Sequence, residues 1–120
     1  MKQTAPLGNT FSVCRDTLLW LVYRWALLKI RIMKIVSFYE MAPGALSKVM
    51  DHYPVHRARL DEFHARGVLL MAGPLGNPPE GAMAVFTTRE AAEEFIKGDP
   101  FVTNDLVSKW RLVEWNAAFI

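Results

Sequence analysis

YPVHRARLDEFHARGVLLMAGPL, residues 53–75, is the stretch of this sequence that decides the fold. A polar helical segment runs through Gly67 into a continuous apolar run, Val68–Ala72, which has the length and composition of a buried strand. Pro54 suits the first turn of a helix, where its missing N–H is harmless, and Gly67 suits the end. The stretch therefore predicts a helix that begins near Pro54, followed by a strand that Gly73-Pro74 terminates.

One histidine of this helix lies on its apolar stripe. Leu60 and Phe63 follow His56 by four and seven positions, so the three side chains share one face that points toward the core. An inward-facing imidazole near a carboxylate can accept and release a proton near neutral pH. A histidine that is simply hydrogen-bonded in the core is the structural alternative. His52 is predicted to precede the helix, and His64 to lie at the margin of the stripe.

The segments around this stretch complete a regular order of strands and helices. The expected elements are a strand over Met33–Glu40, a helical turn over Ala45–Met50, a strand over Ala82–Thr87, a helix ending at Lys97 and a strand over Leu106–Trp115. Thr87 and Glu90 have the T-x-x-E spacing of a capping box for the second main helix. The order βαββαβ predicts an α+β, ferredoxin-like fold with a four-stranded antiparallel sheet and both helices on one face.

The other face of the predicted sheet lacks a covering layer. Phe38, Phe86, Trp110 and Trp115 are the large aromatic residues of the strands, and we expect them to contribute to that face. Monomeric proteins rarely leave a large apolar patch exposed, so the pattern predicts a homodimer that buries it.

The composition is that of one small globular domain. The 120 residues are 52% hydrophobic and 22% charged, which is enough chain for one core. The formal net charge is +2, but residues 33–120 carry nine basic and eleven acidic side chains. This part of the chain has no basic stripe, which argues against nucleic acid as a partner. Cys14 has no second cysteine to pair with, in keeping with a reducing cytoplasm.

Residues 1–32 differ from the rest of the chain, with five basic side chains against one acidic. Leu18–Leu28 is apolar apart from Arg24, but it is about half the roughly 20 residues that a bilayer span needs. Three interpretations remain open: an interfacial amphipathic helix, a helix that docks on a partner, or an extension upstream of a native start at Met33. We favour the extension, which divides the chain into residues 1–32, a main domain over 33–116 and a tail over 117–120.

Other residues offer weaker candidate sites. Asp99 precedes Pro100, where it suits the N-cap of a short turn, and in a βαββαβ fold it can also lie near the first helix and orient His56. The loop expected at Gly73-Pro74 could contact a ligand through its backbone, although an ordinary turn is the simpler interpretation. His52, His56 and His64 do not have the spacing of a known metal motif, so we expect neither a metal nor another cofactor.

From Met33 to Asn116 the chain resembles the YciI-like proteins, the family of the YCII-related domain. The resemblance rests on the opening strand, P-x-H-x-x-x-L from Pro54 to Leu60, G-x-L-L-x-A-G-P from Gly67 to Pro74, D-P-F from Asp99 to Phe101, and the ending Glu114-Trp115-Asn116. It implies a dimeric ferredoxin-like α+β barrel and an active site built on a histidine and an aspartate, which match His56 and Asp99. One branch of the family catalyses dehydrochlorination of a chlorinated hydroxyquinol.

These observations lead to one functional hypothesis and one alternative. The hypothesis is a small-molecule enzyme of the lyase, dehydrochlorinase or isomerase type, in which His56 transfers a proton and Asp99 orients it. Such chemistry needs neither a nucleophile nor a metal. The alternative is a dimeric ligand-binding or accessory module in which the histidine only contacts a ligand.

Overall fold

The computed structural model describes residues 18–25 and 33–120 of the chain. Residues 18–25 are helical, and Met33–Ala117 form a separate compact unit. No helix in these two ranges is both long and apolar enough to cross a bilayer. Cys14 and the remainder of residues 1–32 lie outside the described residues, and a native start at Met33 stays a prediction.

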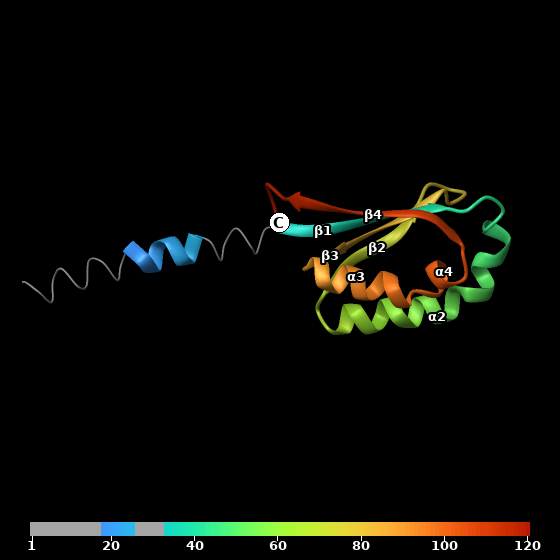
Figure 1. Ribbon diagram of the computed structural model, residues 1–120, viewed down its shortest axis with the longest axis horizontal. Helices are drawn as coiled ribbons and strands as arrows, with labels where there is room; N and C mark the ends of the chain where they lie inside the picture. The colour runs from blue at the N-terminus through green and yellow to red at the C-terminus, as the bar shows by residue number, and fades with distance from the viewer. Residues whose placement is uncertain (1–17, 26–32) are drawn as a thin grey trace, which may run out of the picture. The chain divides into compact units, whose positions relative to one another are not determined.

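The main domain has the predicted order of strands and helices. Its elements are β1 (Met33–Met41), α2 (Leu46–Ala65), β2 (Leu69–Leu75), β3 (Gly81–Phe86), α3 (Arg89–Gly98), the single turn α4 (Pro100–Thr103) and β4 (Val107–Asn116). The sheet order is β2-β3-β1-β4, and all neighbouring strands are antiparallel. Helices α2 and α3 lie on the same side of this sheet (Figure 1). The ferredoxin-like α+β fold is therefore confirmed.

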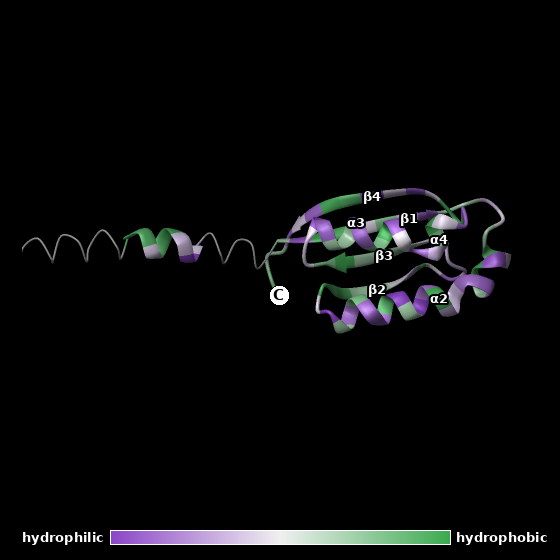
Figure 2. Ribbon diagram, turned by 60° about the horizontal axis from the view of Figure 1, so that its bottom comes forward, coloured by the Kyte–Doolittle hydropathy of each residue, from purple (hydrophilic) through white to green (hydrophobic). Residues whose placement is uncertain are grey.

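The core lies between the sheet and the two long helices. Ile35 of β1 is directly opposite Phe86 of β3, and Phe86 is opposite Leu69 of β2, so three large side chains cross the sheet in one row. Phe63 of α2 and Phe95 of α3 pack on this row. Figure 2 shows hydrophilic and hydrophobic residues alternating along α2, as expected for a helix with one face on the core.

The predicted start of the first long helix at Pro54 is wrong. Helix α2 begins at Leu46, and Pro54 lies inside it. The predicted turn over Ala45–Met50 is the first part of the same helix, and His52 is a helical residue instead of preceding it. Proline in the interior of a helix removes one backbone hydrogen bond and crowds the carbonyl four residues earlier, and the burial of His56 and Phe63 on the inner face of α2 offsets that cost. A proline therefore favours a helix boundary, which the packing of the rest of the helix can override.

The predicted end of the second strand at Gly73-Pro74 is also wrong. Strand β2 continues to Leu75, with Gly73 paired to Met83 and Pro74 paired to Ala82 of β3. Proline is tolerated in a strand at the edge of a sheet, where no neighbour needs its N–H, and β2 is an edge strand. The loop that follows begins at Gly76, which has a positive φ of 80°.

The prediction that all four large aromatic residues of the strands lie on the uncovered face of the sheet is wrong. Phe86 is fully buried beneath the helices, and Trp110 is opposite Tyr39, so neither belongs to the uncovered face of the sheet. The alternation places Phe38 and Trp115 on that face, because they fall between the helix-facing residues of their strands.

The predicted cap of the second main helix is also wrong. Helix α3 is capped by Thr88, whose hydroxyl accepts a hydrogen bond from the Ala91 amide, instead of by Thr87.

Candidate active site

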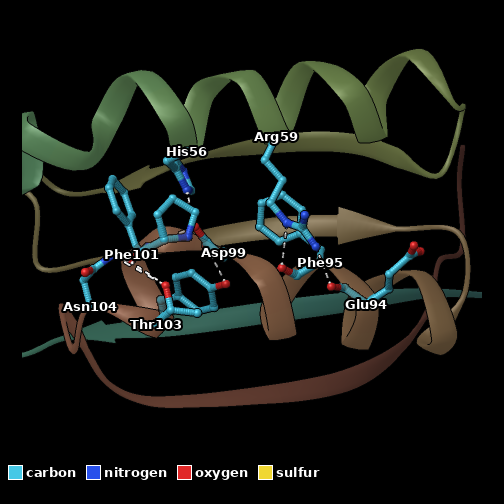
Figure 3. A network of polar contacts seen from close by, with 10 residues as sticks. His56, Arg59, Glu94, Phe95, Asp99, Phe101, Thr103 and Asn104 are labelled. Atoms are coloured by element: carbon cyan, nitrogen blue, oxygen red, sulfur yellow. Dashed lines mark hydrogen bonds and ion pairs between the residues drawn. The ribbon is translucent and has the colours of Figure 1, made fainter.

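His56 and Asp99 lie next to each other in the folded domain although 43 residues separate them in the sequence. Helix α2 carries the imidazole on its inner face, and the junction between α3 and α4 carries the carboxylate. The Nδ1 atom of His56 is 2.7 Å from Oδ1 of Asp99. Figure 3 shows the two side chains pointing toward each other from these elements. The structure thus brings together the two residues that the sequence analysis paired.

The carboxylate of Asp99 is completely buried and accepts three hydrogen bonds. Besides the His56 imidazole, Oδ2 accepts from the hydroxyl of Tyr39 at 2.8 Å and Oδ1 accepts from the Phe101 amide at 3.2 Å. The last bond is the N-cap of α4, so the capping role of Asp99 and its contact with His56 coexist. A buried carboxylate with this many donors is held in one orientation.

Tyr39 is a third member of the buried network. Burial, and then the charge and hydrogen bond of Asp99, raise the pKa of the Tyr39 phenol well above its ordinary value of 10.0. The phenol therefore keeps its proton and remains a hydrogen-bond donor to Asp99. One oxygen of the Asp99 carboxylate, Oδ2, thus binds Tyr39, and the other oxygen, Oδ1, binds His56.

The imidazole of His56 is also fixed by aromatic packing. The Phe101 ring stacks on it with a centroid distance of 3.9 Å and an interplanar angle of 9°. Phe95 approaches it edge-on at 6.1 Å, and Tyr53 is tilted against it at 6.3 Å. With its plane held by Phe101 and Nδ1 held by Asp99, the imidazole has little freedom to turn.

The second ring nitrogen of His56 opens into a cavity of about 630 Å³. His56 lines this cavity, and its one hydrogen bond within the described residues is made by Nδ1. In the part of the chain that the structure describes, no buried side-chain nitrogen or oxygen lacks a hydrogen-bond partner. Because Nε2 makes no such bond, it is not enclosed by protein atoms, and the cavity is the space that His56 lines. Donation from Nδ1–H to Asp99 leaves the lone pair on Nε2, where it can accept a proton.

The cavity is of a size for a small organic molecule and is mostly apolar. Ligand sites of this kind have volumes of roughly 300–1,000 Å³. Met41 and Met50 are among the residues that line it. Methionine side chains adapt to irregular ligands and make favourable contacts with aromatic rings. The cavity therefore offers a base within an apolar, adaptable environment.

Arg59 connects the helix of His56 to the helix that ends next to Asp99. Its guanidinium donates from Nε to the Phe95 carbonyl at 3.1 Å and from Nη2 to the Glu94 carbonyl at 2.7 Å. These carbonyls belong to the last turns of α3, where a cation is favoured. Figure 3 shows Arg59 reaching from α2 to both residues. The bonds set the position of α3 along α2, and Asp99 follows α3 directly.

The remaining candidates from the sequence are placed differently. Gly73 and Pro74 line the cavity, but as residues of a strand instead of a ligand-binding loop, and a role for them in binding stays a prediction. His64 is exposed and also lines the cavity. Within residues 18–25 and 33–120, no three His, Cys, Asp or Glu side chains are grouped as a metal site would require.

Sequence reasoning missed Tyr39 and the stacking of Phe101. The alternation of β1 places Tyr39 on the helix-facing side, but its partner Asp99 is 60 residues away, so periodicity could not identify the contact. A tyrosine directed at a core needs a partner for its hydroxyl, and this requirement was the available signal. Phe101 lies two residues after Asp99, in the D-P-F motif, which placed it near the site without showing the stack.

Comparison with known proteins supports the fold and indicates a family. The family model of the YCII-related domain matches residues 33–116. The solved structure of 5-chloro-2-hydroxyhydroquinone dehydrochlorinase (TftG) from Burkholderia phenoliruptrix AC1100, in complex with 2,5-dihydroxybenzoquinone, aligns with a TM-score of 0.59. The two sequences are 20% identical, and the alignment covers 68% of this chain and 92% of that chain. At this identity the likeness shows the fold alone. No curated protein matches the sequence.

Proposed function

Because the chain belongs to the YCII-related domain family, we propose that it is a small-molecule enzyme in which His56 transfers a proton and Asp99 orients it. The observation that carries the proposal is the 2.7 Å contact between His56 Nδ1 and the buried Asp99 carboxylate, with Nε2 open to the cavity. A base held by a carboxylate and facing a substrate-sized space meets the geometric requirement for general acid–base catalysis.

The proposed step is the removal of a proton from a substrate in the cavity. Nε2 takes the proton, and the electron pair left behind forms a new double bond while a leaving group such as chloride departs with its own pair. The imidazolium that forms is stabilised by Asp99 at Nδ1. If the proton is returned at another position without loss of a group, the same residues perform an isomerisation.

Chlorinated hydroquinones are the first compounds to test. TftG is named as a dehydrochlorinase and was solved with a dihydroxybenzoquinone, and it shares the fold of this chain. The apolar cavity suits a six-membered ring. In the keto tautomer of a chlorinated hydroquinone the carbon that bears chlorine is saturated, so loss of a hydroxyl proton to His56 and loss of chloride together give a quinone. The activity named for TftG is the reason for the choice, and it remains a proposal for this chain.

The deciding experiment compares turnover by the wild type with turnover by His56→Ala. We expect chloride release or isomerisation by the wild type and a loss of about 10²–10⁴-fold in kcat for the variant, the usual contribution of a general base. His52→Ala is the matched control, because His52 is one helical turn earlier and does not line the cavity. Binding without turnover across the screened compounds would instead favour the ligand-binding module.

The proposal includes a homodimer formed through the uncovered face of the sheet. Phe38, Arg111 and Trp115 lie on that face, and the Arg111 guanidinium lies 4.5 Å from the centroid of the Phe38 ring. Trp115 is 46% exposed in the single chain. Association through this face would cover that apolar surface. Sedimentation of the full chain in the ultracentrifuge measures the oligomeric state, and a monomer at all concentrations would contradict the homodimer.

A further inference from the structure

The cavity exists because small side chains replace large ones across the sheet. Ala72 of β2 is opposite Ala84 of β3, and Ala84 is opposite Ser37 of β1, so the three form a row on the helix-facing side. The row through Leu69, Phe86 and Ile35 is filled by large side chains that belong to the core. We call Ala72, Ala84 and Ser37 the cavity floor, because all three line the cavity.

Ser37 is the one residue of the cavity floor with a polar side chain. It is only 4% exposed, and its hydroxyl makes no hydrogen bond within the part of the chain that the structure describes. A buried polar side-chain atom without a partner does not occur in that part of the chain, so the hydroxyl is not enclosed by protein. The oxygen of Ser37 therefore meets the cavity space. Burying a hydroxyl without a partner costs free energy, which a ligand oxygen or water in the cavity can offset.

The hydroxyl of Ser37 is separate from the His56–Asp99 pair, but Ser37 lies on the same strand as Tyr39, which donates a hydrogen bond to Asp99. Ser37 and Tyr39 are two residues apart on one face of β1, a rise of about 6.6 Å. Tyr39 reaches up to Asp99, whereas Ser37 stays at the floor. A molecule in the cavity can thus meet a base from α2 and a hydroxyl from the sheet.

We propose that Ser37 forms a polar subsite that holds a hydroxyl or carbonyl oxygen of the substrate, distinct from the group whose proton passes to His56. The substrate class is then a mostly apolar molecule with an oxygen substituent that rests on the sheet. This inference rests on the proposed function for the role of His56, but the contact at Ser37 is a binding contact and does not require turnover.

The test measures equilibrium binding of two probes of nearly the same shape. Hydroquinone and 4-methylphenol differ by one hydroxyl in place of a methyl group, so the ratio of their Kd values reports contacts to the second oxygen. NMR titration gives both constants for the wild type, Ser37→Ala and Ser37→Thr. Ser37→Ala removes a hydroxyl that makes no hydrogen bond within the described protein, so we expect it to fold as the wild type does.

We expect Ser37→Ala to lower the preference for hydroquinone over 4-methylphenol by about 3–10-fold, the effect of one neutral hydrogen bond. Ser37→Thr keeps the hydroxyl and should keep the preference. An unchanged ratio in Ser37→Ala, or no binding of hydroquinone to the wild type, overturns the subsite. A changed ratio together with full activity of His56→Ala supports the subsite and refutes the proposed role of His56, so the two failures are distinguishable.

Discussion

Replacing Gly98 with alanine should destabilise the domain, although alanine is the better helix former. Gly98 is the last residue of α3, and a Cβ atom added there would lie 2.5 Å from Nη2 and 2.7 Å from Cζ of Arg59. Such contacts are too short, so the guanidinium must move. Because it donates at 2.7 and 3.1 Å to the carbonyls of Glu94 and Phe95, the movement breaks both hydrogen bonds.

The expected loss follows from these two bonds and from the helix propensity of alanine. A hydrogen bond to a charged group contributes about 1.5–3 kcal/mol. Since Arg59 is half-buried and the bond to Glu94 is exposed, we take about 2–3 kcal/mol for both. Alanine in place of glycine returns about 0.5–1 kcal/mol. The net cost is about 1–2 kcal/mol, which lowers the Tm of a domain of this size by roughly 5–15 °C.

Urea and thermal unfolding measure the change, and a double-mutant cycle identifies its cause. In an Arg59→Ala background the clash is absent, so Gly98→Ala should become neutral or stabilising. Gly73→Ala is the control, because no atom lies within 4 Å of a Cβ added at Gly73. Stabilisation by Gly98→Ala in the wild type, or an equal cost with and without the Arg59 side chain, would refute the reasoning.

Two further changes test the buried network and the surface of the domain. Tyr39→Phe removes a hydrogen-bond donor from the fully buried carboxylate of Asp99 and should lower the free energy of unfolding, measured in urea, by about 1–3 kcal/mol. An unchanged free energy of unfolding would show that the hydrogen bond contributes nothing. The hydrogen bond from Arg66 lowers the pKa of the exposed Glu94 carboxyl below its ordinary value of 4.5. This pair therefore stabilises the fold above about pH 4.5 and loses its effect as the pH falls further. In a plot of the free energy of unfolding against pH, Arg66→Ala should slightly reduce the loss of stability below pH 4.5. Identical curves for the variant and the wild type would contradict the expectation.

The fold could be predicted because its local signals agree with each other. Alternation in β1, the apolar run after Gly67 and the spacing of His56, Leu60 and Phe63 each indicate one element, and together they allow few arrangements. The start of α2 could not be predicted, because the proline rule describes the local cost of Pro54, a lost hydrogen bond and a crowded carbonyl, and not the free energy that the rest of the helix contributes by packing. A local rule considers only the cost of a residue next to its neighbours, whereas the stability of the helix depends on the free energy of all its residues together.

The candidate site was predictable only in part, for a similar reason. The helical stripe identified His56, and the βαββαβ order indicated that Asp99 could lie near it, a pairing that the resemblance to a family also implied. The contact of Tyr39 with Asp99 and the open hydroxyl of Ser37 depend on the register between strands and on the depth of the cavity. A single strand pattern specifies which face a side chain occupies but not what it meets there.

The cavity floor has a consequence for how new activities could arise in this fold. The proton-transfer pair comes from the helical layer, while the depth of the cavity comes from Ala72, Ala84 and Ser37 in the sheet. Exchanging one floor residue for a larger or more polar one alters which molecules fit, and it leaves both members of the pair on their own elements. Selectivity can therefore drift, or be redesigned, one side chain at a time while the base stays in place.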